Sequence, residues 1–307
     1  MANLKAIRKR IGTVKSTQKI TRAMKMVAGA RLNRAQRRIT ELRPYAVKTQ
    51  EVLSEVTAAG REQLAEDAAD GRGGDAETHP LLEVRPERRV LLVVLTSDRG
   101  LCGSFNANIN KRAEQEWKQR TADGQEVEIL VIGRKGRDYL KRRGAPMVFE
   151  PEVWQDLGWE SARDLGRKIL HYFLRRKDPV DAIYLIYNEF KSAMTQRVVA
   201  EALIPVPAPR DDDDEKAEEH NVDFLFEPSK NALLSQLVPM YVQISVLRAL
   251  YESMASELGA RMTAMDSATS NASDMISKLT LKYNRARQAA ITTELTEIIS
   301  GSEALEG

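Results

Sequence analysis

The stretch LTSDRGLCGSFN, from Leu95 to Asn106, has the residue types of an active-site loop. An apolar run leads into it, two glycines spaced G-x-x-G enclose a cysteine, and a helical pattern follows. Strand, glycine turn and helix is the arrangement with which α/β proteins hold phosphates or place a nucleophile. The first question is whether Gly100, Cys102 and Gly103 could perform such chemistry.

The spacing and the missing partners disfavour catalysis. A dinucleotide fingerprint needs G-x-G-x-x-G and a phosphate loop ends in Gly-Lys-Ser/Thr, and neither is present here. A nucleophilic Cys102 would need a histidine to activate it. His79 and His220 lie in expected loops, and His171 lies in a helical pattern. One cysteine and three histidines also disfavour a zinc site. We therefore interpret Gly100 and Gly103 as permitting a sharp turn, and expect no catalytic residue, cofactor or metal.

The segments around this turn alternate between strand and helix patterns. Buried-strand runs occupy Val90–Leu95, Val127–Gly133 and Ala182–Asn188. Helical patterns occupy Asn106–Gln119, Arg134–Lys141 and Glu160–Arg176. This βαβ rhythm predicts a small, mostly parallel α/β domain. The runs RVVAEALIP and VDFLFEP are candidate late strands.

The N-terminal segment predicts one long helix. Apolar residues recur at alternate spacings of three and four from Leu4 to Val56, about seven heptads, which is typical of a coiled coil. Pro44 is expected to kink the helix because it removes a backbone donor. The main exceptions to the pattern are Gln18, Thr21 and Lys25. At that point the apolar stripe is expected to move to the neighbouring face with Ile20, Met24 and Val27.

The C-terminal segment repeats the pattern from Leu237 to Ile298, with small residues between Met262 and Met275. One helix alone cannot bury such a stripe, so we expect the two ends of the chain to form an antiparallel coiled coil that carries the α/β domain. The predicted parts are an N-terminal helix over 1–58, a loop over 59–87, the α/β domain over 88–228 and a C-terminal helix over 229–307. The domain includes an acidic insertion over 209–221.

Composition limits where the protein works. The single cysteine precludes an internal disulfide and fits a reducing compartment. We find no apolar run near the roughly 18 residues that cross a bilayer, so any membrane association is expected through a partner. The N-terminus lacks the apolar core of a secretory signal, although its basic, acid-free character is compatible with an organelle transit peptide.

The basic N-terminal helix leaves two kinds of partner open. Residues 1–40 contain twelve Lys or Arg and no Asp or Glu, although the net charge of the chain is only +3. Such a helix could bind nucleic acid, but no aromatic residue precedes Tyr45 to stack on bases. It equally suits an acidic protein, because complementary charge sets register and encounter rate. For the chain as a whole, the alternatives are a free-standing α/β enzyme and a coiled-coil α/β adaptor that binds nucleic acid or another acidic partner.

Three segments carry a specific resemblance. TQKITRAMKMVAGARL, LTSDRGLCGSFN and YNRARQAAITTELTEIISG, in that order, resemble the gamma subunit of F-type ATP synthases. The resemblance spans nearly the whole chain and begins within its first residues, which argues against a cleaved transit peptide. The chain departs from the usual pattern in the lengthened loop from Ala59 to His79 and in the acidic insertion at Asp211.

The resemblance implies a rotor shaft that is not itself an enzyme. Its coiled coil would stand inside a ring of three alpha and three beta subunits. A Rossmann-like domain would join the epsilon subunit and the membrane ring of c subunits. Proton flow would turn the shaft, and its asymmetry would move each beta site through different affinities. No nucleic acid is implied. The expected place is the cytoplasmic side of a bacterial inner membrane, bound peripherally.

The resemblance also implies residues that contact beta. Met24, with Arg22 and Lys25 beside it, matches the family's coupling position next to the acidic lobes of beta. The loop that holds Arg99 and Cys102 is placed near the same lobes by the resemblance. The C-terminal matches would meet a beta loop higher in the ring. The implied contact residues are Arg22, Met24, Lys25, Arg99, Cys102, Arg287, Gln288, Thr292 and Glu294.

Overall fold

The computed structural model describes residues 4–69, 85–151, 153–175, 177–205 and 230–306. It forms two compact units, Met1–Ala30 with Arg261–Gly307, and Arg31–Ala260. Helices α1 (Leu4–Ala69) and α6 (Lys230–Glu306) contribute to both units. The boundaries predicted from the sequence assign each terminal helix to a part of its own, whereas this division cuts both helices. The reason is that Leu53 of α1 and Leu250 of α6 share one core with the sheet.

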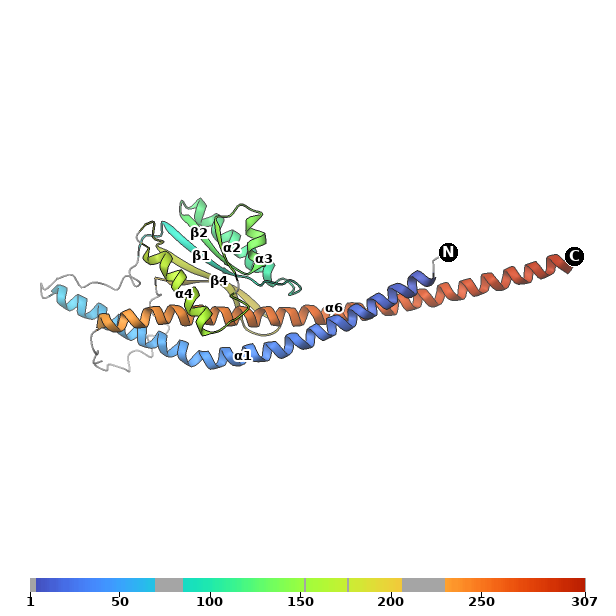
Figure 1. The fold of residues 1–307 in the computed structure, drawn as a ribbon, viewed down its shortest axis with the longest axis horizontal. Helices are drawn as coiled ribbons and strands as arrows, with labels where there is room; N and C mark the ends of the chain where they lie inside the picture. The colour runs from blue at the N-terminus through green and yellow to red at the C-terminus, as the bar shows by residue number, and fades with distance from the viewer. Residues whose placement is uncertain (1–3, 70–84, 152, 176, 206–229, 307) are drawn as a thin grey trace. The chain divides into compact units, whose positions relative to one another are not determined.

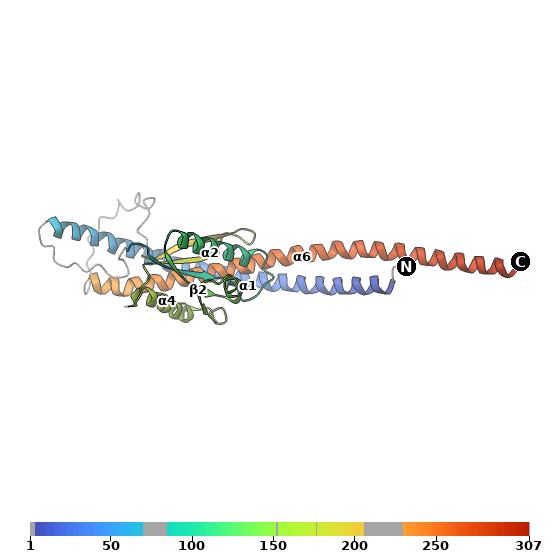
Figure 2. The ribbon, with the colours of Figure 1, turned by 90° about the horizontal axis from the view of Figure 1, so that it is seen from above.

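The second unit is built on a five-stranded sheet with the order β3-β2-β1-β4-β5 (Figures 1 and 2). The strands are β1 (Arg89–Leu95), β2 (Glu126–Ile132), β3 (Met147–Glu150), β4 (Ala182–Phe190) and β5 (Gln196–Ile204). The β1–β2, β1–β4 and β2–β3 pairs are parallel, and β4–β5 is antiparallel. The predicted small, mostly parallel sheet is therefore confirmed, with RVVAEALIP as β5.

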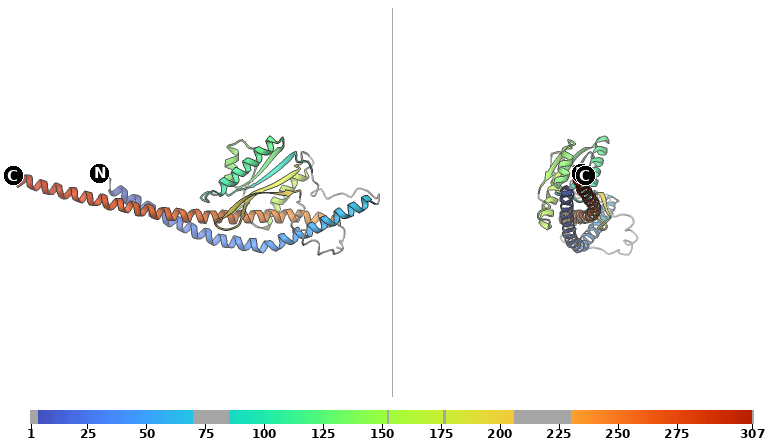
Figure 3. Two further views of the ribbon diagram at one scale, coloured as in Figure 1. Left: turned by 180° about the vertical axis from the view of Figure 1, so that it is seen from behind. Right: turned by 90° about the vertical axis from the view of Figure 1, so that its right-hand side faces the viewer.

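Helices cover both faces of the sheet (Figures 1 and 3). Helix α2 (Phe105–Ala122) and α3 (Arg134–Lys141) pack on one face, and α4 (Trp159–Leu174) and α6 on the other. Successive residues of β1 belong in turn to the hydrophobic cores on the two faces of the sheet, because successive side chains of a strand point to opposite faces. Leu92 and Val94 join the α2 side, whereas Leu91 and Val93 join the α4 and α6 side.

Two sequence expectations need correction. Helix α1 continues to Ala69, so the predicted loop from residue 59 is wrong for residues 59–69. Alanine, glutamate, glutamine, leucine and arginine dominate this stretch, and their helix propensity outweighs the single Gly60. Strand β3 was not expected, because four partly exposed residues show no clear alternation. The candidate strand VDFLFEP and the acidic insertion lie outside the described residues.

Helix α6 also contains the most apolar long segment. The stretch Ala232–Ser302 includes an 18-residue window of mean hydropathy 1.3, long and apolar enough by composition to cross a membrane. This window reaches that length only by including polar residues, so it is not an uninterrupted apolar run. Of that window, 56% is buried inside the protein, so packing accounts for its apolar character.

Candidate functional site

In the first unit, α1 and α6 run antiparallel and meet through a layer of polar side chains. The contacts join Gln18 to Ser273 at 2.6 Å, Thr21 to Thr269 at 2.8 Å and Lys25 to Asp266 at 2.5 Å. Each step toward the C-terminus on α1 is matched by a step toward the N-terminus on α6, which confirms the antiparallel pairing. Polar seam residues of this kind specify register at a cost in stability.

The sequence suggested that the contact between the helices moves here to the neighbouring face of α1, and the structure shows that it does not. Gln18, Thr21 and Lys25 stay between the helices, because α6 supplies a hydrogen-bonding partner for each. Ile20 is instead 60% exposed and Val27 is 53% exposed. The result is a polar seam flanked by an outward apolar row.

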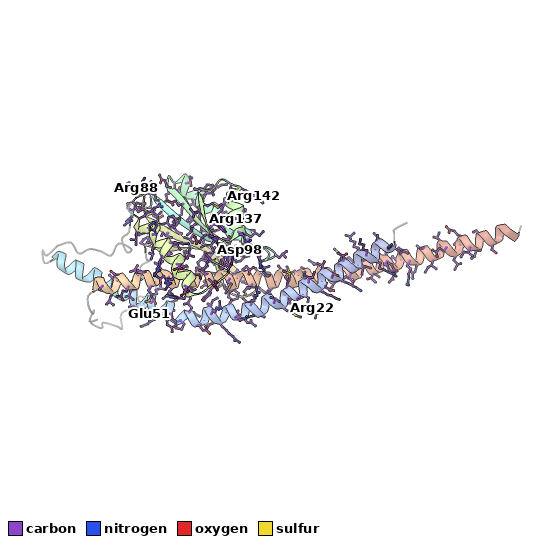
Figure 4. All side chains as sticks on the ribbon, in the orientation of Figure 1. Arg22, Glu51, Arg88, Asp98, Arg137 and Arg142 are labelled. Carbon is purple, nitrogen blue, oxygen red and sulfur yellow. The ribbon has the colours of Figure 1, made fainter. Side chains whose placement is uncertain are left out.

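Met24 lies between these two surfaces and is partly exposed. Arg22 is exposed on the same stretch of α1, where Figure 4 labels it, and forms no ion pair with the residues that the structure describes. Lys25 differs, because its ammonium group is already paired with Asp266. An outward apolar row beside an unpaired cation is a surface suited to a protein partner.

Replacing both seam threonines with valine should raise the melting temperature of the full-length chain. Valine has nearly the shape of threonine, and removing both partners of a hydrogen bond leaves no polar group unsatisfied. Each single replacement, Thr21→Val or Thr269→Val, should instead cost up to about 1 kcal/mol. Circular dichroism at 222 nm would follow the melting of the four proteins. A double variant less stable than both singles would show that the hydroxyl pair is a net stabilising contact.

The end of α6 presents the second predicted group. Arg287, Gln288, Thr292 and Glu294 are all exposed. Thr292 donates its hydroxyl to the Gln288 carbonyl at 3.0 Å, as expected for a helical threonine. Apolar side chains share the exposed surface here, namely Ile291, Leu295, Ile298 and Ile299. This stretch continues beyond the N-terminal end of α1 (Figures 1 and 3).

The loop after β1 is held by a hydrogen-bond network around its cysteine. Asn106 accepts from the Ser97 amide at 3.0 Å and donates to Cys102 Sγ at 3.1 Å. The Ser97 hydroxyl donates to the Arg99 carbonyl at 2.6 Å. Asp98, labelled in Figure 4, accepts from the Arg134 amide at 2.9 Å. These contacts tie the loop to the start of both following helices.

The network changes the role of two predicted residues. Cys102 is only 1% exposed, so its thiol anchors the loop and does not lie on the surface, whereas Arg99 is exposed. Gly103 adopts a positive φ of 56°, as expected for a sharp turn, but the other left-handed residue is Leu101, with φ 65°, and not Gly100. Leu101 is also 65% exposed, and sequence reasoning missed it. A non-glycine residue in this conformation is uncommon outside sites that constrain it.

The structure separates Cys102 from the histidine it describes. Cys102 packs in the core between the sheet and α2, whereas His171 belongs to α4 on the other face. His79 and His220 lie outside the described residues. Among the residues that the structure places, no group of three or more His, Cys, Asp or Glu could hold a metal ion. The loop is therefore built as a turn with an exposed tip.

Of the three predicted groups, two share a unit without meeting. Arg22, Met24 and Lys25 lie opposite the Thr269 region of α6. From Thr269 to Arg287 the helix rises about 27 Å at 1.5 Å per residue, so the groups are distinct surfaces along one coiled coil. Arg99 and Cys102 belong to the second unit.

Comparisons with known proteins agree over the whole chain. The family described as ATP synthase matches residues 3–305. The ATP synthase gamma chain of Sorangium cellulosum is 62% identical over 324 aligned residues, and that of Geobacter sp. is 48% identical over 307, each covering 100% of both chains.

Solved structures show the same fold. The central stalk and c-ring of the Tetrahymena thermophila mitochondrial ATP synthase contains a chain of 25% identity and TM-score 0.56, matching 81% of this chain and 99% of that one. A Euglena gracilis mitochondrial ATP synthase contains another, at 20% identity and TM-score 0.54, over 90% and 95%.

The long terminal helices, the mostly parallel sheet and the full-length matches point the same way. The resemblance of the three quoted segments is thus confirmed, and the protein is a subunit of a membrane-associated complex. The chain belongs to the family of ATP synthase gamma chains, the rotor subunits of the central stalk.

Proposed function

We propose that this chain is the non-catalytic shaft that couples proton flow through the c-ring to ATP synthesis, and to hydrolysis in reverse, at beta sites. The supporting observation is the character of its exposed surfaces. The last turns of α6 carry an apolar surface, including Leu295 at 55% and Ile298 at 72% exposure. Apolar contacts are non-directional, so they can be exchanged during rotation without breaking individual hydrogen bonds.

Within that function, we assign the α1 surface to the beta lobes. Arg22 offers an unpaired positive charge, and Met24, Ile20 and Val27 offer apolar contact area beside it. Lys25 would act only if its pair with Asp266 opens, because an exposed ion pair is weak. An acidic partner would be attracted by the charge and would slide on the apolar row.

The other two groups are assigned to neighbouring surfaces of the same partners. Arg99 would contact beta directly, with Cys102 holding the loop that presents it. Arg287, Gln288, Thr292 and Glu294 would meet a beta loop higher in the ring of three alpha and three beta subunits. All four side chains are exposed, with Arg287 and Glu294 on one side of the helix and Gln288 and Thr292 on a neighbouring side, which supports this assignment.

We assign the α/β domain to the epsilon subunit and the c-ring, and expect no nucleic acid among the partners. The relatives from Sorangium and Geobacter are bacterial proteins that match this chain over its full length. They support a peripheral position on the cytoplasmic side of a bacterial inner membrane.

Replacing Met24 with lysine should lower the number of protons pumped per ATP hydrolysed in the assembled complex. The new ammonium group would lie beside acidic lobes and form a contact that must break at each step. Hydrogen bonds to charged groups contribute about 1.5–3 kcal/mol, which would slow that step about tenfold or more. Proton pumping and ATP hydrolysis would be measured together in reconstituted vesicles.

Met26→Lys is the matched control, because Met26 is 63% exposed two residues away on another face of α1. It should leave the ratio of pumping to hydrolysis near that of the parent. An unchanged ratio in Met24→Lys would remove the coupling role from this position.

A further inference from the structure

Within the second unit, α6 packs closely against the end of the β4–β5 hairpin. Ser256 donates its hydroxyl to the Asn188 carbonyl of β4 at 3.0 Å, and both residues are buried. A Cβ added at Gly259 would lie 3.2 Å from the Ala193 backbone, in the turn between the strands. The two elements therefore approach to backbone distance, and Ser256 and Asn188, which lie between them, are shielded from water.

A cluster of polar side chains lies in this contact. The Tyr187 hydroxyl of β4 donates to one carboxylate oxygen of Glu201 on β5, at 2.6 Å. Arg248 of α6 donates to the other oxygen of the same carboxylate. Each carboxylate oxygen of Glu201 therefore has its own donor, one the cation of Arg248 and the other the hydroxyl of Tyr187.

The carboxylates of this cluster outnumber the cations that are paired with them. Glu189, Glu201 and Glu252 supply three carboxylates, and Arg248 and Lys191 supply the two paired cations. Arg197 of β5 lies opposite Glu189 in the strand pairing, but it is exposed and forms no ion pair with the described residues. Lys191 pairs with Glu189 at 2.7 Å, and Arg248 pairs with Glu201. Glu252 of α6 is left as the excess carboxylate, and its Oε2 atom is buried without a hydrogen-bond partner among the described residues.

The surroundings of Glu252 reinforce this imbalance. The titratable and charged groups around it come from α6, β4, the β4–β5 turn and β5, while α1 contributes Arg38 over the ring of Tyr251 at 5.8 Å. Those acting on the cluster are Tyr241, Arg248, Tyr187, Glu189, Lys191 and Glu201.

Burial raises the pKa of the Glu252 carboxyl to about 7. The opposing attraction of Arg248 is partly offset by repulsion from Glu189 and Glu201. Burial also raises the pKa of the Tyr187 hydroxyl, which therefore stays protonated and keeps donating to Glu201.

We propose that Glu252 makes the contact between α6 and the β4–β5 hairpin a proton-responsive joint. With the carboxyl protonated, the contact is closed, because a neutral group is cheaper to bury than an unpaired anion. Loss of the proton leaves an anion with no cation of its own, and water reaches it when the joint opens. This device is independent of the beta contacts proposed above and acts inside the chain itself.

The direction of the pH dependence follows from the raised pKa. Below about pH 4.5 the carboxyl is protonated in both the closed and the open joint, so the stability of the contact is fully present. Between about pH 4.5 and 7 the open joint has lost the proton and the closed joint has kept it, so closure weakens as pH rises. Above about pH 7 both states are ionised and the loss is complete.

Hydrogen exchange on the full-length chain tests the joint. The opening constant for the amides of β4 and β5, corrected for intrinsic exchange, should increase by up to about tenfold per pH unit between pH 5 and 7, then level off. In Glu252→Gln this dependence should be lost, with slower exchange at pH 8 than in the parent. Asp274→Asn, an exposed carboxylate of the same helix, should behave like the parent.

A second variant keeps the test decisive if Glu252→Gln folds poorly. Glu201→Gln retains an oxygen that accepts from Tyr187 but removes one negative charge and releases Arg248 toward Glu252. Both changes favour the ionised carboxylate, so the transition should move to lower pH. A Glu252→Gln chain with the parent's pH dependence, or a Glu201→Gln chain with no shift, would overturn the proposal.

Discussion

Replacing Gly133 with alanine should lower the free energy of unfolding of the second unit by at least about 3 kcal/mol. Gly133 is the N-cap residue that precedes α3, and its φ of 97° is a backbone conformation that L residues rarely adopt. A Cβ there would lie 2.0 Å from the Thr96 carbonyl oxygen and 2.5 Å from its carbon. Backbone atoms cannot rotate away as a side chain can, so β1 and α3 would have to separate.

The loss should spread to the loop that follows β1. The Thr96 hydroxyl accepts from the Gly136 amide at 2.8 Å and donates to the Ile132 carbonyl at 3.0 Å, so the same movement would break these bonds. Urea unfolding followed by tryptophan fluorescence would measure the change. Gly124→Ala is the control, because Gly124 also has a positive φ, 83°, but has open space around it. It should cost only about 1 kcal/mol, and equal losses in the two variants would disprove the close contact.

Truncating Leu250 to alanine should cost about 2–5 kcal/mol, because it removes buried methyl groups and leaves a cavity. Leu250 is fully buried where α6 joins the core of the sheet and α4. The substitution should loosen α6 from the α/β domain while leaving the coiled-coil unit folded. Urea unfolding monitored by fluorescence for the domain and by circular dichroism for the helices would separate the two effects.

Leu281→Ala on the same helix is the matched control. Leu281 is 60% exposed, and surface truncations usually change stability by less than about 0.5 kcal/mol. If Leu250→Ala were equally mild, α6 would not be anchored to the domain through this core.

Periodicity identified the long helices because burial in a coiled coil depends mainly on spacing. Every heptad position predicted from Leu4 to Leu53 is buried or partly buried. The three main strands were also visible, since a parallel sheet covered on both faces needs continuous apolar runs. The edge strand β3 was not predicted, because a short, half-exposed strand does not need a continuous apolar run.

Local signals failed where a partner far along the chain decides the outcome. Gln18, Thr21 and Lys25 looked unsuited to a seam, but Ser273, Thr269 and Asp266 make them compatible with it. Likewise, Leu101 and not Gly100 takes the left-handed conformation in the loop after β1. Neither choice can be read from spacing, because it depends on contacts between segments.

The sequence by itself determined that two heptad-patterned helices flank a βαβ domain and which family the chain resembles, and it predicted a turn in place of a catalytic loop. Those features depend on residue type and local spacing. Only the tertiary structure decided that Cys102 is an anchor, that Ile20 and Val27 face outward, and that Glu252 is a partly buried carboxylate whose Oε2 atom has no hydrogen-bond partner among the described residues. These features depend on which distant residues come into contact and on how far water is excluded from them. Burial and charge balance are therefore properties of the folded chain and not of any single segment.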